Sequence, residues 1–280
     1  MPDANCQSED MSIADEQREL WNGSSGQAWV DVQAITDVMF APLAQLLAAE
    51  ARPGERVLDV GCGAGATTRA LADAVGPSGT TTGVDISAPL VEAARAHESP
   101  ADYIVADAGT YPFEPGAYDL LTSRFGVMFF ADPGAAFANL RRAARDGARL
   151  RAITWRSVEE NPFMSTAGRA ARPLLPDLPT PPADGPGQFA FADAERVAAI
   201  LTGAGWSTVD HEPLDVELTM PAAGLDTYLT RLGPLSRVLP TLEPARREHV
   251  MATVRDAFAP YMHGDDARFT AACWVLKATA

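Results

Sequence analysis

The chain is poor in positive charge, and lysine is almost absent from it. Its 280 residues include 37 acidic and 22 basic side chains, with a net charge of −15. Lys277 is the one lysine, so arginine supplies the other basic side chains. An acidic surface repels phosphate backbones and anionic bilayers at long range. We therefore expect neither a nucleic acid nor a membrane as partner.

Cysteine is also scarce, and long apolar runs are absent. Cys6, Cys62 and Cys273 are widely spaced and form no CxxC pair, so neither a disulfide framework nor a metal site is expected. No run of about 18 uncharged apolar residues could form a membrane span. The N-terminal residues are acidic and lack the apolar core of a secretion signal. These absences predict a cytoplasmic protein.

What the chain does contain is a glycine-rich loop between a strand pattern and a helix pattern. Residues 57–65 read VLDVGCGAG, and a helical pattern follows from Ala66 to about Val75. Glycines permit backbone conformations with φ > 0 and leave space where a ligand approaches the chain. The order of strand, glycine-rich loop and helix is typical of a nucleotide-type binding site.

The loop alone leaves two kinds of ligand open. Gly61, Gly63 and Ala66 also fit a looser dinucleotide fingerprint, in which alanine replaces the last glycine. Asp59, two residues before the first of these glycines, favours the other kind. Its carboxylate would repel a pyrophosphate but suits a ligand that carries an ammonium and a sulfonium group.

Three more predicted strands end in residues that suit such a ligand. The strand over residues 81–86 ends at Asp85, about 20 residues past the glycines, where a carboxylate can bind ribose hydroxyls. The strand over 103–108 ends at Asp107, and the strand over 118–123 leads into Arg124.

This ordered series resembles the class I S-adenosylmethionine (SAM)-dependent methyltransferases over roughly residues 41–155, and the core is similar to the ubiquinone/menaquinone group. The resemblance implies S-adenosyl-L-methionine as cofactor. It also implies the cofactor contacts: Asp59, Gly61, Cys62, Gly63 and Gly65 at the glycine loop; Asp85 at the ribose; Ile86, Asp107 and the Ala108 N–H at adenine; Ser123, Arg124 and Phe125 beside the methionine moiety; and Trp29 from a lid. Trp21 and Trp29 could instead be anchors that dock an N-terminal helix.

Strand and helix patterns alternate beyond the loop, which predicts an α/β fold with a doubly wound, Rossmann-like sheet. Ser87 and Asp132 are predicted N-caps of helices through His97 and Ala144, the second ended by Gly147. An amphipathic helix is expected over 32–49, and a regular helix closed by Gly205 is expected over 193–204. Strands are expected over 149–155, within 206–218 and over 269–277, and the resemblance implies that the last is antiparallel.

We expect the chain to be divided into seven segments. These are a disordered tail (1–12), an N-terminal helical lid (13–40), the SAM-binding core (41–155), a proline-rich insertion (156–190), more core (191–220), a helical insertion (221–266) and a final core strand (267–280). The first insertion holds seven prolines and one predicted helix near 163–171. The second has predicted helices over 225–232 and 244–257. Because both follow strands of the sheet, they should emerge beside the cofactor and form a cap over the substrate.

The function expected from these features is methyl transfer from SAM to a small molecule by in-line displacement. Leucine, methionine, proline and phenylalanine in the cap favour an apolar or aromatic acceptor. No catalytic residue is assigned, because a general base is needed only when the nucleophile arrives protonated. Two alternatives stay open: an NAD(P)-dependent oxidoreductase, against which Asp59 and Asp107 argue, and a non-catalytic SAM-binding module. A homodimer is left open, and the arginine and alanine bias favours a bacterial source.

Overall fold

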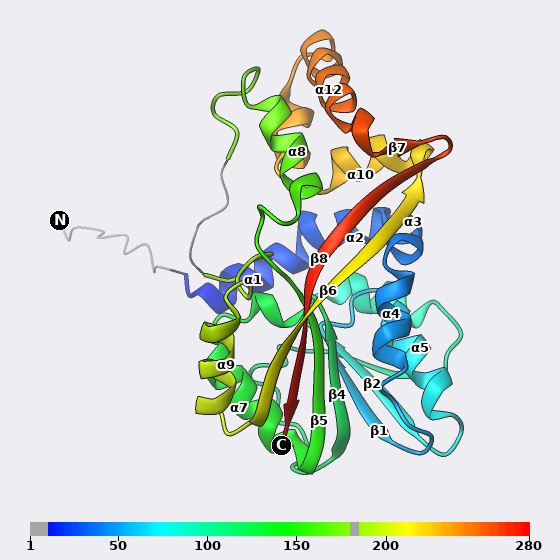
Figure 1. Ribbon diagram of the computed structural model, residues 1–280, viewed down its shortest axis with the longest axis vertical. Helices are drawn as coiled ribbons and strands as arrows, with labels where there is room; N and C mark the ends of the chain where they lie inside the picture. The colour runs from blue at the N-terminus through cyan, green and yellow to red at the C-terminus, as the bar shows by residue number, and fades with distance from the viewer. Residues whose placement is uncertain (1–10, 180–184) are drawn as a thin grey trace, which may run out of the picture.

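A single mixed sheet organises the protein (Figure 1). The computed structural model describes residues 11–179 and 185–280. Within these, the strand order is β3-β2-β1-β4-β5-β8-β6, and β7 pairs with β8. The strands are β1 (Arg56–Val60), β2 (Thr80–Asp85), β3 (Asp102–Val105), β4 (Tyr118–Arg124), β5 (Ala144–Trp155), β6 (Ser207–Pro221), β7 (Met262–His263) and β8 (Asp266–Thr279).

The predicted doubly wound sheet is confirmed. Strands β1 to β5 pair with one another in parallel, whereas β8 runs antiparallel to both β5 and β6. The helices are α1 (Ile13–Asn22), α2 (Ser24–Asp31), α3 (Gln33–Met39), α4 (Ala41–Ala48), α5 (Ala66–Val75), α6 (Ala88–Arg95), α7 (Pro133–Ala143), α8 (Pro162–Ala171), α9 (Ala194–Gly203), α10 (Leu225–Arg231), α11 (Leu235–Val238) and α12 (Pro244–Phe258). No helix of the described residues is long and apolar enough to cross a membrane.

The predicted N-caps form as expected. The side chain of Ser87 accepts a hydrogen bond from Leu90 N at 3.5 Å, and that of Asp132 accepts one from Ala135 N at 3.0 Å. These bonds satisfy N–H groups that have no partner within the helix. Pro133 then occupies the first turn of α7, where its missing N–H costs nothing.

Two predicted helix boundaries are wrong. The single helix expected over 32–49 is two helices, α3 and α4, which meet at Phe40. Pro42 explains the break, because its ring would clash with the Val38 carbonyl in a continuous helix. Helix α7 ends at Ala143 and not at Gly147, and β5 begins at once. Gly147, with φ 77°, lies in the irregular stretch where the β4–β5 register shifts.

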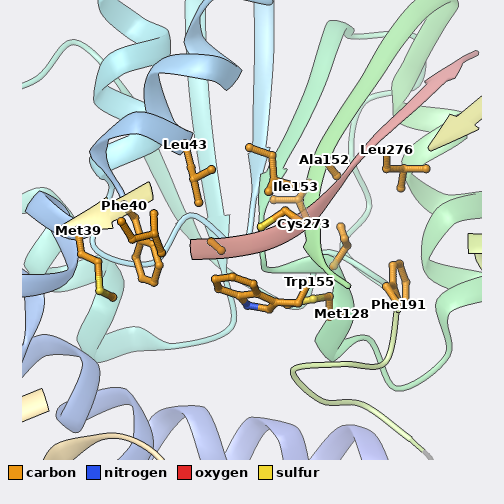
Figure 2. Packing of buried hydrophobic residues seen from close by; sticks show 14 of the residues in the cluster. Met39, Phe40, Leu43, Met128, Ala152, Ile153, Trp155, Phe191, Cys273 and Leu276 are labelled. Carbon is orange, nitrogen blue, oxygen red and sulfur yellow. The ribbon is translucent and has the colours of Figure 1, made fainter. Parts of the chain in front are cut away.

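The core joins the sheet to the N-terminal helices (Figure 2). Met39 and Leu43 are fully buried, and Leu276 of β8 lies in the same cluster as Trp155 at the end of β5. Burial of each such side chain contributes roughly 1.5–3 kcal/mol. The packing holds α3 and α4 firmly against the sheet.

The N-terminal segment and the two insertions lie towards the carboxyl ends of the parallel strands (Figure 1). Strand β5 leads into α8, and β6 leads into α10, α11 and α12; α8 and α12 pack on each other. Arg231 of α10 forms a 3.2 Å ion pair with Asp31 of α2. Most of the expected tail, residues 1–10, lies outside the described residues, as do residues 180–184 of the first insertion.

Candidate functional site

The three glycines of the loop between β1 and α5 serve two different purposes. All have positive φ: 68° at Gly61, 53° at Gly63 and 82° at Gly65. A Cβ on Gly61 would lie 2.6 Å from Gly126 Cα, and one on Gly65 would lie 2.6 Å from the Tyr103 hydroxyl. A Cβ on Gly63 would meet nothing within 4 Å. Gly61 and Gly65 therefore allow the protein to pack against itself, whereas Gly63 leaves open space.

A cavity opens at this edge of the sheet, with about 1190 Å³ of space including its mouth. Ten of the thirteen predicted cofactor residues line it: Trp29, Gly61, Cys62, Gly63, Asp85, Ile86, Asp107, Ala108, Arg124 and Phe125.

Asp59 is one of the three predicted residues that do not line the cavity. It is 1% exposed, and its oxygens accept hydrogen bonds from Thr68 Oγ1 at 2.7 Å and Thr122 Oγ1 at 3.2 Å. Burial raises the pKa of Asp59 to about 6, against the lowering effect of the Thr68 hydroxyl. The geometry thus indicates that this carboxylate supports the loop from inside the protein.

Gly65 and Ser123 also lie behind the cavity wall. Ser123 is fully buried, and its hydroxyl donates to Val60 O at 2.8 Å. The same oxygen accepts from Gly126 N at 3.1 Å and Val127 N at 3.2 Å. Ser123 therefore ties the turn after β4 to the end of β1.

Asp85 faces the cavity from the end of β2. Its two oxygens accept hydrogen bonds from Gly63 N at 2.8 Å and from Ser87 N at 2.9 Å. Burial raises the pKa of Asp85, and these backbone bonds oppose that rise. Each oxygen keeps further acceptor capacity, so the carboxylate can also bind hydroxyl groups of a ligand. Asp107 is held in a similar way, by Gly109 N at 2.8 Å.

Phe125 has a strained backbone. Its φ is 67°, which is uncommon for a residue with a side chain. Its ring stacks on Trp155 with centroids 4.2 Å apart and an interplanar angle of 4°, and it meets the Phe40 ring edge-on at 5.6 Å. Strain of this kind persists where the surroundings enforce it and is common at functional sites. The sequence carried no signal for it.

Arg124, next to Phe125, is a buried cation at the cavity wall. Its guanidinium lies 5.2 Å from the Phe40 ring centroid, and Nη1 donates to Phe40 O at 3.5 Å. Burial lowers the pKa of Arg124, while the negative charges of Asp59 and Asp37 raise it. Even so, an arginine stays protonated in proteins.

The N-terminal helices supply the wall opposite the sheet. Sequence reasoning missed most of their contribution: Ala14 and Gln17 of α1, Gln33, Thr36 and Asp37 of α3, and Phe40, together with Phe129 and Phe130 after β4. Trp21, named beforehand only as an anchor, meets the Phe129 ring edge-on at 5.0 Å. The sequence pattern of α1 indicates an apolar face, but it does not indicate which part of the protein that face packs on.

The two insertions reach the cavity only indirectly. Among their described residues, 156–179, 185–190 and 221–266, none lines it. Instead, Trp155 meets the Phe163 ring at 6.3 Å, and Phe163 stacks on Phe269 at 4.9 Å. These rings fill the space behind Phe125. Within the part of the chain that the structure describes, no group of three or more potential metal ligands occurs.

Comparison with known proteins gives this geometry a context. Residues 58–152 match a family model described as a methyltransferase domain. Nocamycin O-methyltransferase of Saccharothrix syringae is 30% identical over 243 residues, which are 79% of this chain and 84% of that protein. An uncharacterized 37.1 kDa protein in a Streptomyces fradiae transposon is 38% identical over 127 residues, so the match spans 44% of this chain and only 37% of that protein. Demethylmenaquinone methyltransferases are among the further relatives.

A solved structure agrees with the fold. Phosphoethanolamine N-methyltransferase 2 of Haemonchus contortus, in complex with S-adenosyl-L-methionine, superposes with a TM-score of 0.56. The superposition covers 94% of this chain and 59% of that one at 15% sequence identity.

Proposed function

The chain belongs to the class I SAM-dependent methyltransferases with S-adenosyl-L-methionine as cofactor, and from this premise we propose that it methylates a small molecule by in-line displacement. The observation that carries the proposal is that Gly63 and Asp85 face one cavity at the carboxyl edge of the sheet. In such a reaction the cofactor supplies a methyl group on an electrophilic sulfonium. The protein's task is then to orient both partners and to exclude water.

The cavity wall suits the parts of the cofactor. Asp85 is proposed to bind the ribose hydroxyls, and Ile86 and Ala108 to border the adenine, with Asp107 at its amine. Arg124 and Asp37 also line the cavity, and they carry opposite charges. They are proposed to bind the carboxylate and the ammonium of the methionine moiety, respectively.

This assignment changes the role expected of Asp59. Its oxygens already accept hydrogen bonds from Thr68 and Thr122. We therefore propose that Asp59 holds the loop in place and does not contact the ligand. Cys62, also at the wall, has a pKa raised well above its ordinary value by burial. Such a thiol is a poor nucleophile, so Cys62 is proposed to be a small packing residue.

An apolar or aromatic acceptor is supported by the remaining wall. Trp21, Trp29, Phe125, Phe129 and Phe130 all line the cavity. Flat apolar ligands gain from burial against such rings. The similarity to nocamycin O-methyltransferase along most of the chain also supports a small-molecule acceptor.

The insertions are proposed to act as a cap that holds the lid closed over the acceptor. The Asp31–Arg231 ion pair joins α2 to α10, and Gly224 packs closely on Ile35 of α3. The acceptor would then lie under the lid helices, and the lid under the cap.

The first test is binding. Calorimetric titration with S-adenosylhomocysteine (SAH), the demethylated product of SAM, should give a defined affinity, and titration with NAD(H) should give none. Asp85→Ala should bind SAH about 10- to 150-fold more weakly, as expected for lost charge-assisted hydrogen bonds. Preferential NAD(H) binding would contradict the proposal.

The second test is turnover. Radiolabelled methyl transfer should be assayed with a panel of flat aromatic small molecules and with metabolites from cell extract. Incorporation of label into a small molecule is the expected result. Tight SAH binding with no transfer to any acceptor would favour a non-catalytic SAM-binding module.

A further inference from the structure

Asn22, the last residue of α1, connects the lid to the loop between β2 and α6. Its Nδ2 donates to Ile86 O at 2.9 Å, and its Oδ1 accepts from Ala88 N at 2.9 Å. Ala88 is the first residue of α6, where backbone N–H groups lack partners within the helix. A side chain 66 positions earlier in the chain thus supplies one of the missing partners.

Ser87 adds a third bond between the same two segments. Its hydroxyl donates to Trp21 O at 2.7 Å, and Ser87 itself is fully buried. Its backbone N–H donates to Asp85, which in turn accepts from Gly63 N. A continuous series of hydrogen bonds therefore runs from the glycine loop through Asp85 and Ser87 to the end of α1.

Within the described residues, helix α1 has few other contacts with distant segments. None of its residues is buried, although Ala14, Gln17 and Trp21 line the cavity. The Trp21 ring also meets the Phe129 ring edge-on. Gly26 of α2 allows a close approach, since a Cβ there would lie 2.0 Å from Trp21 O. A helix docked by a few polar bonds at one end can open as a unit.

We propose that Asn22 is a positioning residue that couples occupancy of the adenosine end of the cavity to closure of α1. The inference rests on the proposed function of the cavity as the SAM site. Asp85 and Ile86 would contact the ligand, and the bonds to α1 come from Ile86, Ser87 and Ala88. The groups that Asn22 binds, Ile86 O and Ala88 N, belong to the loop over residues 85–88. A ligand that orders this loop therefore also orders the partners of Asn22. SAH can then leave only when these bonds open.

The test uses Asn22→Ala in the full chain, with Glu16→Gln as the control on the exposed side of the same helix. Wild type and Glu16→Gln should release SAH at the same rate in stopped-flow experiments that follow tryptophan fluorescence. Asn22→Ala should release it about tenfold faster, the factor expected for the loss of about one to two net hydrogen bonds. Asn22→Asp keeps the acceptor for Ala88 N and loses the donor to Ile86 O, so its rate should lie between the two.

Amide hydrogen exchange separates coupling from a merely structural role. SAH should slow exchange over residues 13–22 in the wild type and in Glu16→Gln, but not in Asn22→Ala. A structural role alone would speed exchange equally with and without SAH. The coupling would be refuted if SAH left exchange over 13–22 unchanged in the wild type, or if Asn22→Ala released SAH at the wild-type rate. Failure of the wild type to bind SAH would overturn the proposed function as well.

Discussion

Gly61 and Gly126 pack back to back, so that the loop after β1 touches the turn after β4. A Cβ on Gly126 would lie 2.7 Å from Gly61 Cα and 2.6 Å from Val60 O. Real Cβ contacts of that length essentially do not occur, so neither position admits a side chain without movement of backbone. The contact sets the distance between the glycine loop and Phe125, and hence the width of the cavity at that point.

The Gly126→Ala variant tests this contact without backbone strain. Gly126 has φ −77° and ψ −41°, which alanine adopts readily, so the cost comes from the clash alone. We expect the free energy of unfolding to fall by about 1–3 kcal/mol and SAH binding to weaken. Urea denaturation and calorimetry measure the two effects. Gly203→Ala is the control: it lies in α9 with nothing within 4 Å and should gain about 0.5–1 kcal/mol. Equal stability of the two variants would refute the role of the contact.

Gly63→Ala should harm binding more than folding. The position has φ 53° and open space around a Cβ, so the protein loses only about 1–2 kcal/mol of stability. The added methyl group would occupy cavity space, and we expect SAH affinity to fall at least about tenfold. Gly116→Ala is the control, with φ 66°, equally open space and no place in the cavity. It should lose similar stability and keep normal SAH affinity; a matching loss of affinity would place the ligand elsewhere.

Asp59 predicts a pH dependence of stability. Its pKa is about 6 in the folded protein and 3.8 as the ordinary value. Between these pH values the folded state binds more protons than the unfolded state, so the free energy of unfolding falls as pH rises. The difference corresponds to at most about 3 kcal/mol, lost by pH 7. Asp85 adds to the same trend. Urea denaturation from pH 4 to 7.5 should show a shallower fall in Asp59→Asn than in the wild type; parallel curves would contradict it.

At position 125, the glycine variant should be more stable than the alanine variant, which is the reverse of the usual order. Its φ of 67° suits glycine, so Phe125→Gly should be about 1 kcal/mol more stable than Phe125→Ala, although both lose the stack on Trp155. Phe130 has φ −61° and provides the control, where alanine should be the more stable replacement. Thermal or urea unfolding of the four variants measures the order. The same order at both positions would show that Phe125 is not strained.

Local features of the fold were predictable because neighbouring residues determine them. Ser87 and Asp132 cap helices through bonds that span three residues, and period and composition identify each strand. Pro42 also indicates a break before α4, because proline cannot continue a helix. The amphipathic pattern across the break nevertheless suggested a single helix. Gly147 suggested a helix end, whereas the pairing of β4 with β5 placed it in a strand.

The sequence by itself determined most of the helices and strands and their order along the chain, because each rests on a pattern within a short stretch of chain. That order and the resemblance to a known family predicted the parallel sheet and its ligand edge. Only the tertiary structure decided which side chains meet there. Asp59 accepts hydrogen bonds from two threonines, and Gly126 packs against Gly61. Asn22 donates a hydrogen bond to Ile86, 64 positions later in the sequence. No local pattern encodes such distances, because they depend on how the sheet brings separate loops to one edge. For the same reason the N-terminal helices, and none of the described residues of the insertions, contribute to the wall of the cavity.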